Sequence, residues 1–246
     1  MGYGYLAPGR SKPRGYASNL LSGFNPESLS LDLWLEARSG TYSDAGTTPA
    51  VDTDPVYQWN DLSGNNRNWS QGTLNNRALL KLVSGKWIVE SDGTDDFMTL
   101  GSDYVIGMTH TLVFAFRSLN TSDQMLISKA DASAQWRING NGNAAKALHY
   151  DATDAPLSDV FSSAFTDWTV LGFRRVGNTM TFYEGLTARG TGGITISGLP
   201  HINRLFDYSG GLSARIQCAG IFALSDQLSD DDYASLVDYA TGLMPA

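Results

Sequence analysis

The chain has 246 residues, of which 42% are hydrophobic and 11% aromatic, and it contains 26 glycines. This composition excludes an intrinsically disordered chain, and the many glycines and aromatic rings favour strands and turns over helices. The net charge of −8 argues against a nucleic-acid partner, because phosphate groups are bound by basic surfaces.

The sequence contains no signal-peptide pattern and no apolar run near the ~20 residues that a membrane span needs. We therefore expect synthesis and folding in a cytoplasm. Cys218 is the single cysteine, so an intrachain disulfide is excluded. Its apolar, strand-like surroundings predict a buried structural thiol rather than a nucleophile.

Residues 1–28 differ from the rest of the chain. Gly, Pro, Ser and Tyr dominate this segment, no period of 2 or 3.6 persists, and three basic residues stand against one acid, Glu27. Two interpretations fit: a flexible tail, or an N-terminal arm that orders only against another subunit. For the second, the docking residues are Tyr3, Tyr5, Arg10, Lys12, Arg14, Tyr16 and Phe24.

After this arm the sequence predicts strands and turns. Residues 31–36 alternate, with three leucines on one face. In residues 109–117, THTLVFAFR, both faces are apolar, which predicts a central strand that is covered on both sides. Residues 167–185 form the clearest hairpin, because two β-rich runs flank Gly177-Asn178.

A single helix is expected, after a last strand over residues 214–224. Ser229 is a favourable N-cap residue, and the three aspartates that follow it lie at the positive end of the helix dipole. The apolar stripe with helical spacing consists of Tyr233, Leu236, Val237, Ala240 and Met244. About a dozen strands without strand–helix alternation predict an all-β antiparallel sandwich, with residues 29–246 as one domain.

Several stretches occur together in a recognisable order: LDLWLEA (31–37), VYQWNDLSGNNRNWSQGT (56–73), VESDGTDDFMTL (89–100), the hairpin (167–185) and the closing helix (224–243). They resemble the concanavalin A-like (laminin-G-like) lectin/glucanase domains of bacterial and phage proteins, although Ser91 stands where that family often has Phe. The resemblance covers about residues 29–243. It implies a jelly-roll sandwich of two packed antiparallel sheets, one of them concave.

The residues of WNDLSGNNRNWSQGT (59–73) predict a corner between two strands. Asp61 and the Ser63-Gly64-Asn65 segment have turn-forming side chains, and Trp59 is expected to be buried. The sequence leaves open whether Asn66, Asn68 and Trp69 face solvent. SDGTDDF (91–97) predicts a second corner, with Gly93 at positive φ.

The acidic residues do not form a glycosidase pattern. Hydrolases that share the implied fold resemble one another in a Glu-x-Asp-x-x-Glu strand, which places two carboxylates on one face. Here the four glutamates are scattered, at Glu27, Glu36, Glu90 and Glu184. The histidines, His110, His149 and His201, lie far apart and lack metal-ligand spacing. We therefore expect no enzymatic activity.

Two kinds of binding site remain. Asp92, Asp95 and Asp96, or else Asp61, could bind calcium, which is the one cofactor left open. Sugar binding needs exposed aromatic faces beside short polar side chains. The aromatic candidates are Trp69, Tyr104, Trp136 and Tyr208, near Asn66, Asn68, Asn139 and Asp207.

Two functions from different classes fit these expectations. The first is a structural virion protein of a bacteriophage, a head (capsid) decoration or a tail accessory subunit. Its arm would dock on other virion proteins, and its lectin-like domain would face outward for host-surface or glycan adhesion. Such a protein would be a homo-oligomer located in the virion, without nucleic-acid or membrane partners. The alternative is a free carbohydrate-binding module or adhesin without a virion role.

Overall fold

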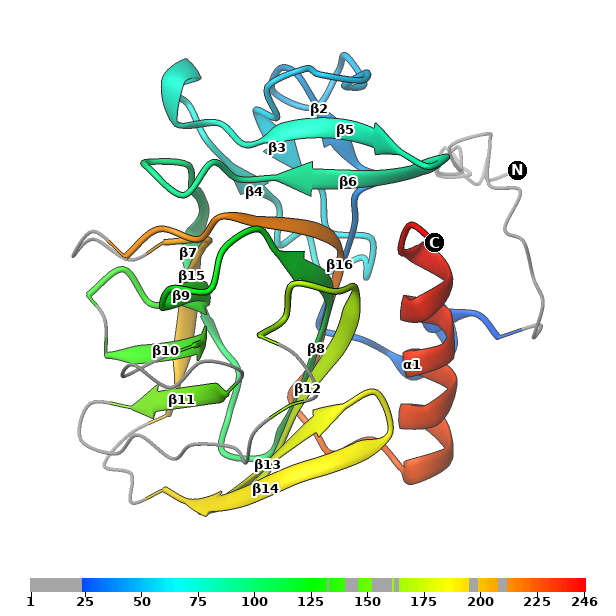
Figure 1. The fold of residues 1–246 in the computed structure, drawn as a ribbon, viewed down its shortest axis with the longest axis vertical. Helices are drawn as coiled ribbons and strands as arrows, with labels where there is room; N and C mark the ends of the chain where they lie inside the picture. Colours follow the sequence, from blue (N-terminus) through cyan, green and yellow to red (C-terminus); the bar gives the residue numbers. More distant parts are fainter. Residues whose placement is uncertain are drawn as a thin grey trace, which may run out of the picture.

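The computed structural model describes residues 24–131, 133–139, 146–151, 161, 164–194, 199–207 and 212–246. Within them the chain forms two eight-stranded antiparallel sheets (Figure 1). The helical elements are η1 (Pro26–Leu29) and η2 (Leu74–Asn76), both 3-10 turns, and α1 (Asp230–Leu243). No helix in the described ranges has the length and apolarity that crossing a membrane requires. The expected all-β sandwich with a C-terminal helix is confirmed.

The first sheet, sheet A, runs in the order β14-β13-β12-β8-β16-β6-β5, and β1 pairs with β16 beside this path. Its strands are β1 (Leu33–Glu36), β5 (Leu79–Val83), β6 (Lys86–Glu90), β8 (His110–Ser118), β12 (Thr169–Val176), β13 (Thr179–Glu184), β14 (Thr187–Gly193) and β16 (Ile216–Leu224). β8 lies between β12 and β16 and is therefore a central strand.

The second sheet, sheet B, runs in the order β11-β10-β9-β15-β7-β4-β3-β2. Its strands are β2 (Thr41–Tyr42), β3 (Gln58–Trp59), β4 (Trp69–Ser70), β7 (Met98–Val105), β9 (Gln124–Ser128), β10 (Ala134–Ile138), β11 (Ala147–Asp151) and β15 (His201–Leu205). Trp59 and Trp69 are cross-strand neighbours that face the core. The neighbouring line of residues that pair across the strands of this sheet is polar and consists of Gln58, Ser70, Thr99, Arg204, Ser128 and Gln135.

The central strands of sheet A are buried on both faces. Leu112, Phe114 and Phe116 of β8 join the core between the two sheets. Val113 and Ala115, on the opposite face, join a second core with α1. Figure 1 shows α1 beside β8, β12 and β16, on the side away from β9–β11. The prediction that this strand is covered on both sides is confirmed.

The hairpin and the helix start also match the sequence. Val176 pairs with Thr179, so Gly177-Asn178 forms the two-residue turn, and Gly177 has a φ of +57°. The N–H of Asp232 donates to Ser229 Oγ at 3.1 Å, which is the expected N-cap bond.

The apolar stripe of α1 differs from the sequence prediction at one position. Its buried members are Tyr233, Leu236, Val237, Ala240 and Leu243. The helix ends at Leu243, and Met244 is extended with φ −78° and ψ 148°. Leu243 therefore completes the stripe in place of Met244.

The docking residues expected in the arm are mostly outside the described ranges: Tyr3, Tyr5, Arg10, Lys12, Arg14 and Tyr16. Phe24 is described, and its ring packs edge-on against Tyr239 of α1, with 6.1 Å between the centroids. Phe24 thus has a contact within its own domain, and docking of the arm on another subunit stays a prediction.

Helix α1 comes close to sheet A at Gly172 of β12. A Cβ built at this position would lie 2.0 Å from Tyr233 Oη and 3.0 Å from Tyr233 Cζ. Tyr233 Oη donates to the carbonyl of Gly185 at 3.1 Å, and its ring is almost fully buried. The ring cannot move away without losing this bond, so the close approach requires glycine.

We expect Gly172→Ala to lower the free energy of unfolding by about 1–3 kcal/mol, because overpacking displaces Tyr233 or the helix. Urea unfolding measures this. Gly193→Ala is the matched control, since a Cβ at Gly193 meets nothing within 4 Å. Equal effects of the two alanines would contradict the close-approach argument.

His110 is a fully buried histidine at the start of β8. Its Nδ1 hydrogen bonds with the carbonyl of Gly107 at 2.9 Å, and its ring packs edge-on to Trp136 at 5.8 Å. The pKa of His110 is lowered to about 4, mainly because the ring is buried, and the positive charge of Arg175 lowers it further. The folded state therefore holds this histidine neutral.

Because this pKa is lower in the folded state than the unfolded value of about 6.5, the stability from neutral His110 is present above pH 6.5. It is lost as the pH falls toward 4. We expect the unfolding free energy to fall by about 3 kcal/mol more in the native chain than in His110→Gln between pH 7 and pH 4. Urea unfolding at several pH values measures it.

His201→Gln is the control for this pH dependence, because the His201 side chain is 35% exposed. Carboxylates titrate in the same range in every variant, so only the difference between variants isolates His110. Parallel pH profiles for the native chain and His110→Gln would show that burial of this ring does not depress its pKa.

Candidate functional site

The corner between β3 and β4 is organised by Asp61. Its carboxylate is nearly buried and accepts four hydrogen bonds, at 2.8–3.1 Å, from the N–H groups of Trp34, Ser63 and Arg67 and from the hydroxyl of Ser63. The N–H of Asp61 itself donates to Asn68 Oδ1 at 3.0 Å. A buried carboxylate with this many donors is fully satisfied. Asp61 thereby fixes the turn that follows it, as the sequence predicted.

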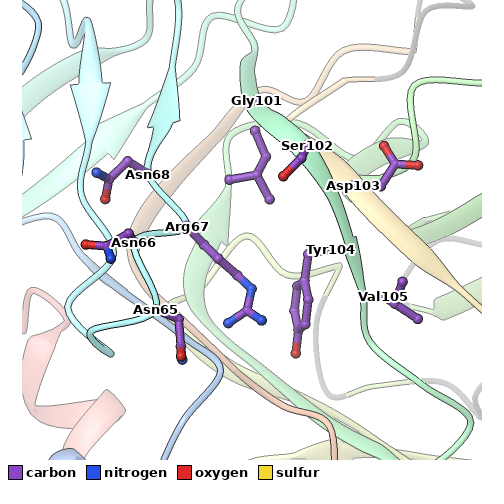
Figure 2. A pocket seen from close by; sticks show the side chains of 10 residues that line it. Asn65, Asn66, Arg67, Asn68, Gly101, Ser102, Asp103, Tyr104 and Val105 are labelled. Atoms are coloured by element: carbon purple, nitrogen blue, oxygen red, sulfur yellow. The ribbon is translucent and has the colours of Figure 1, made fainter.

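An open pocket of about 650 Å³ lies between this turn and β7. Figure 2 shows both walls, with the side chain of Arg67 extending toward the ring of Tyr104. The turn contributes Asn65, Asn66, Arg67 and Asn68, and the other wall is formed by Leu100, Gly101, Ser102, Asp103, Tyr104 and Val105. This volume falls in the range of small-molecule binding sites.

Arg67 is held in a fixed position over Tyr104. Its guanidinium carbon lies 4.2 Å from the centre of the tyrosine ring, within cation–π distance. Its Nη1 donates to the carbonyl of Asp32 at 2.5 Å. Tyr104 is 4% exposed, and its hydroxyl hydrogen bonds with Ser225 Oγ at 3.0 Å. Burial raises the pKa of Tyr104, so this ring stays neutral.

Two other polar side chains at the pocket have no hydrogen-bond partner among the described residues. Asn66 is exposed, with a φ of +58°, and its amide makes no hydrogen bond to the described part of the chain. The exposed hydroxyl of Ser102 makes none there either. Asn68 Oδ1 accepts the N–H of Asp61, whereas Asn68 Nδ2 makes no hydrogen bond to the described residues. The pocket therefore offers amide and hydroxyl groups that can bond a polar ligand.

Asp103 is engaged from the neighbouring strands. Asn203 Nδ2 donates to its Oδ1 at 2.6 Å. Its Oδ2 lies 3.5 Å from His201 Nδ1 and 3.8 Å from Lys129 Nζ. These contacts hold and partly balance the Asp103 charge.

The aromatic part of the predicted glycan site is corrected by the structure. Trp69 and Trp136 are both 0% exposed, and the ring face of Tyr104 is covered by Arg67. Rings buried in this way cannot stack on a sugar, because both faces already pack against protein. Tyr208 lies outside the described residues.

The predicted polar residues divide between the pocket and the interior. Asn66 and Asn68 line the pocket, whereas Asn139 and Asp207 are buried elsewhere. Asp207 pairs with Arg204 at 2.7 Å. The sequence did not single out Arg67, Ser102 or Asp103. One signal could have found Arg67, since it is the one cation within an asparagine-rich turn.

The carboxylates of Asp92, Asp95 and Asp96 lie within 4.8 Å of one another. Asp96 Oδ2 accepts the N–H of Asp92 at 2.9 Å, and Asp92 Oδ1 accepts the N–H of Thr94 at 2.7 Å. Burial raises the pKa of Asp96 to about 6, and the neighbouring aspartates add to the shift. Turn bonds account for Asp92 and Asp96, and calcium binding stays a prediction. Asp61 is separate, and its carboxylate is saturated by the four donors described above.

No protein-family model and no curated protein matches this sequence. Solved structures share its fold. The binding domain of Paraclostridial Mosquitocidal Protein 1 aligns with a TM-score of 0.63 and 11% identity, over 87% of this chain and 53% of that chain. The ligand-binding domain of botulinum neurotoxin serotype D, in complex with N-acetylneuraminic acid, has a TM-score of 0.60 and 12% identity over the same shares.

A shorter protein aligns over nearly all of its length. Domain 4 of AbnA, a GH43 extracellular arabinanase from Geobacillus stearothermophilus in complex with arabinotriose, has a TM-score of 0.58 and 11% identity. The alignment covers 84% of this chain and 98% of that domain. This chain spans about half of the two toxin fragments. At such low identity these likenesses show the fold alone, a β-sandwich of two antiparallel sheets.

Proposed function

We propose that this domain is a carbohydrate-binding module and that the pocket between the Asn65–Asn68 turn and β7 receives the sugar. The observation that carries the proposal is a set of polar groups on the pocket walls that have no hydrogen-bond partner among the described residues: the Asn66 amide, the Ser102 hydroxyl and two nitrogens of Arg67. Sugars are bound by such fixed amide, hydroxyl and guanidinium groups. Two proteins of the same fold are in complex with N-acetylneuraminic acid and with arabinotriose, which supports the assignment by analogy.

The proposed module is not an enzyme. Three of the four glutamates are each engaged in a different place. Glu36 is 1% exposed and bonds Trp34 and Arg38, Glu90 bonds Gln217 and Lys81, and Glu184 bonds Arg189. Most glycosidases use two Asp or Glu carboxylates that face each other across one sugar bond. The glutamates are too separated to form such a pair, and the aspartate carboxylates that lie together, Asp92, Asp95 and Asp96, are outside the pocket, which supports a binding role.

We expect the double substitution Asn66→Gly and Ser102→Ala to weaken glycan binding at least about tenfold, because it removes two hydrogen-bonding side chains. Glycine keeps the positive φ of position 66. A glycan array identifies the ligand, and calorimetry compares the variants. Trp136→Ala is unsuitable as a test, since it would leave a cavity in the core.

Asn178→Gly is the matched control for this experiment. It removes an exposed asparagine in the β12–β13 turn, which does not line the pocket. The control should bind glycan as the native chain does, and all variants should keep the native melting temperature. Undiminished binding by the pocket variant would rule out this site.

The finer proposal is that the module serves as a virion subunit docked by residues 1–28. It rests on the sequence resemblance and on the basic, tyrosine-rich composition of that segment. We expect a chain that begins at Phe24 to keep its melting temperature, because the Phe24–Tyr239 contact is retained. The same truncation should abolish co-sedimentation with phage particles assembled in its presence. Particles that still incorporate the truncated chain would refute docking by the arm.

A further inference from the structure

Arg67 is the one basic side chain among the residues that line the pocket. Its Nη1 is used by the carbonyl of Asp32, a neutral acceptor that leaves the guanidinium charge in place. Its Nε and Nη2 make no hydrogen bond within the described part of the chain, and the side chain is 27% exposed. These two nitrogens form one edge of the guanidinium with parallel N–H bonds, the geometry that matches a carboxylate.

The nearby acids do not cancel this charge. Asp103 is already bound by Asn203, His201 and Lys129. The carboxylate of Asp32 lies 3.8 Å from Arg67 Nη1, and both side chains are 27% exposed. An ion pair of this length and exposure is weak compared with a two-point charge-assisted hydrogen bond.

The guanidinium is also pre-positioned. Tyr104 covers one side of it, and the tyrosine is in turn anchored through its hydroxyl to Ser225. The N–H of Ser225 donates to Asp32 Oδ2 at 2.5 Å, so the residues that hold Arg67 are themselves linked. A fixed guanidinium loses little side-chain entropy when a ligand binds.

We propose that the pocket recognises a sugar that bears a carboxylate. The carboxylate meets the Nε/Nη2 edge of Arg67, while Asn66 and Ser102 bond the sugar hydroxyls. Arg67 is the residue that determines specificity, and Tyr104 is a positioning residue. This inference rests on the proposed function, and it goes further by specifying that the bound sugar is negatively charged.

The test uses the full chain and matched glycan pairs that differ only in carboxylate charge: sialylated glycans against their methyl esters, and oligogalacturonates against theirs. The acidic member should bind at least about tenfold more tightly, and this preference should shrink as salt rises, because the attraction is screened. Arg67→Gln should abolish the preference. Arg67→Lys, which keeps the charge without the two-point edge, should retain part of it.

Arg77→Gln is the matched control. Arg77 also lies over a tyrosine, with its guanidinium carbon 4.7 Å from the Tyr57 ring, and it bonds the carbonyls of Gln71 and Gly72. It does not line the pocket, so the acid preference should survive its loss.

Three other outcomes would overturn the charge inference, the role of Arg67 or the proposed function. Binding of neutral glycans that is equal or tighter, and that is lost in the Asn66→Gly/Ser102→Ala variant, overturns the charge inference while the proposed function stands. If Arg67→Gln still prefers acidic glycans, Arg67 does not determine the specificity. An array with no bound glycan of either kind overturns the proposed function and this inference together.

Discussion

The central strands of sheet A are buried on both of their faces, and much of the molecule's layout follows from this constraint. They meet sheet B on one side and α1 on the other, so they carry apolar residues in both directions. Where the helix comes closest, the strands have glycine, at Gly172 and Gly220. Strands covered on both faces leave no surface for polar chemistry. The polar groups that line the pocket lie instead on β7 of sheet B and on the turn between β3 and β4.

The turn that forms the pocket depends on one buried carboxylate. Asp61 bonds the N–H of Trp34 in β1 and the N–H of Arg67 in the turn, so it ties the corner to the strand that packs under α1. A carboxylate with four donors stabilises the turn and also sets where it projects. Asn66 can then hold a positive φ at the tip with its amide in solvent. The stability of the fold and the geometry of the pocket share this residue.

In the proposed sugar site, Tyr104 is an aromatic residue that serves a polar pocket without touching the ligand. Its ring lies under the guanidinium of Arg67, which fills the place where a sugar would otherwise stack. Recognition in such a pocket relies on directed hydrogen bonds and charge rather than on ring contacts. Affinity for a single sugar is then expected to be modest, since little apolar area is buried.

The sequence by itself determined the elements whose signals are local. The Gly177-Asn178 hairpin, the Ser229 N-cap, the two-faced strand of β8 and the Asp61 corner all follow from neighbouring residues and strand or helix periodicity. Only the tertiary structure decided which rings are exposed, because burial of Trp69 and Trp136 depends on the facing sheet. It also decided the pocket, since Arg67, Tyr104, Asp32 and Ser225 come from four distant segments. Contacts between such segments are set by how the two sheets and the helix pack, and no local pattern encodes them.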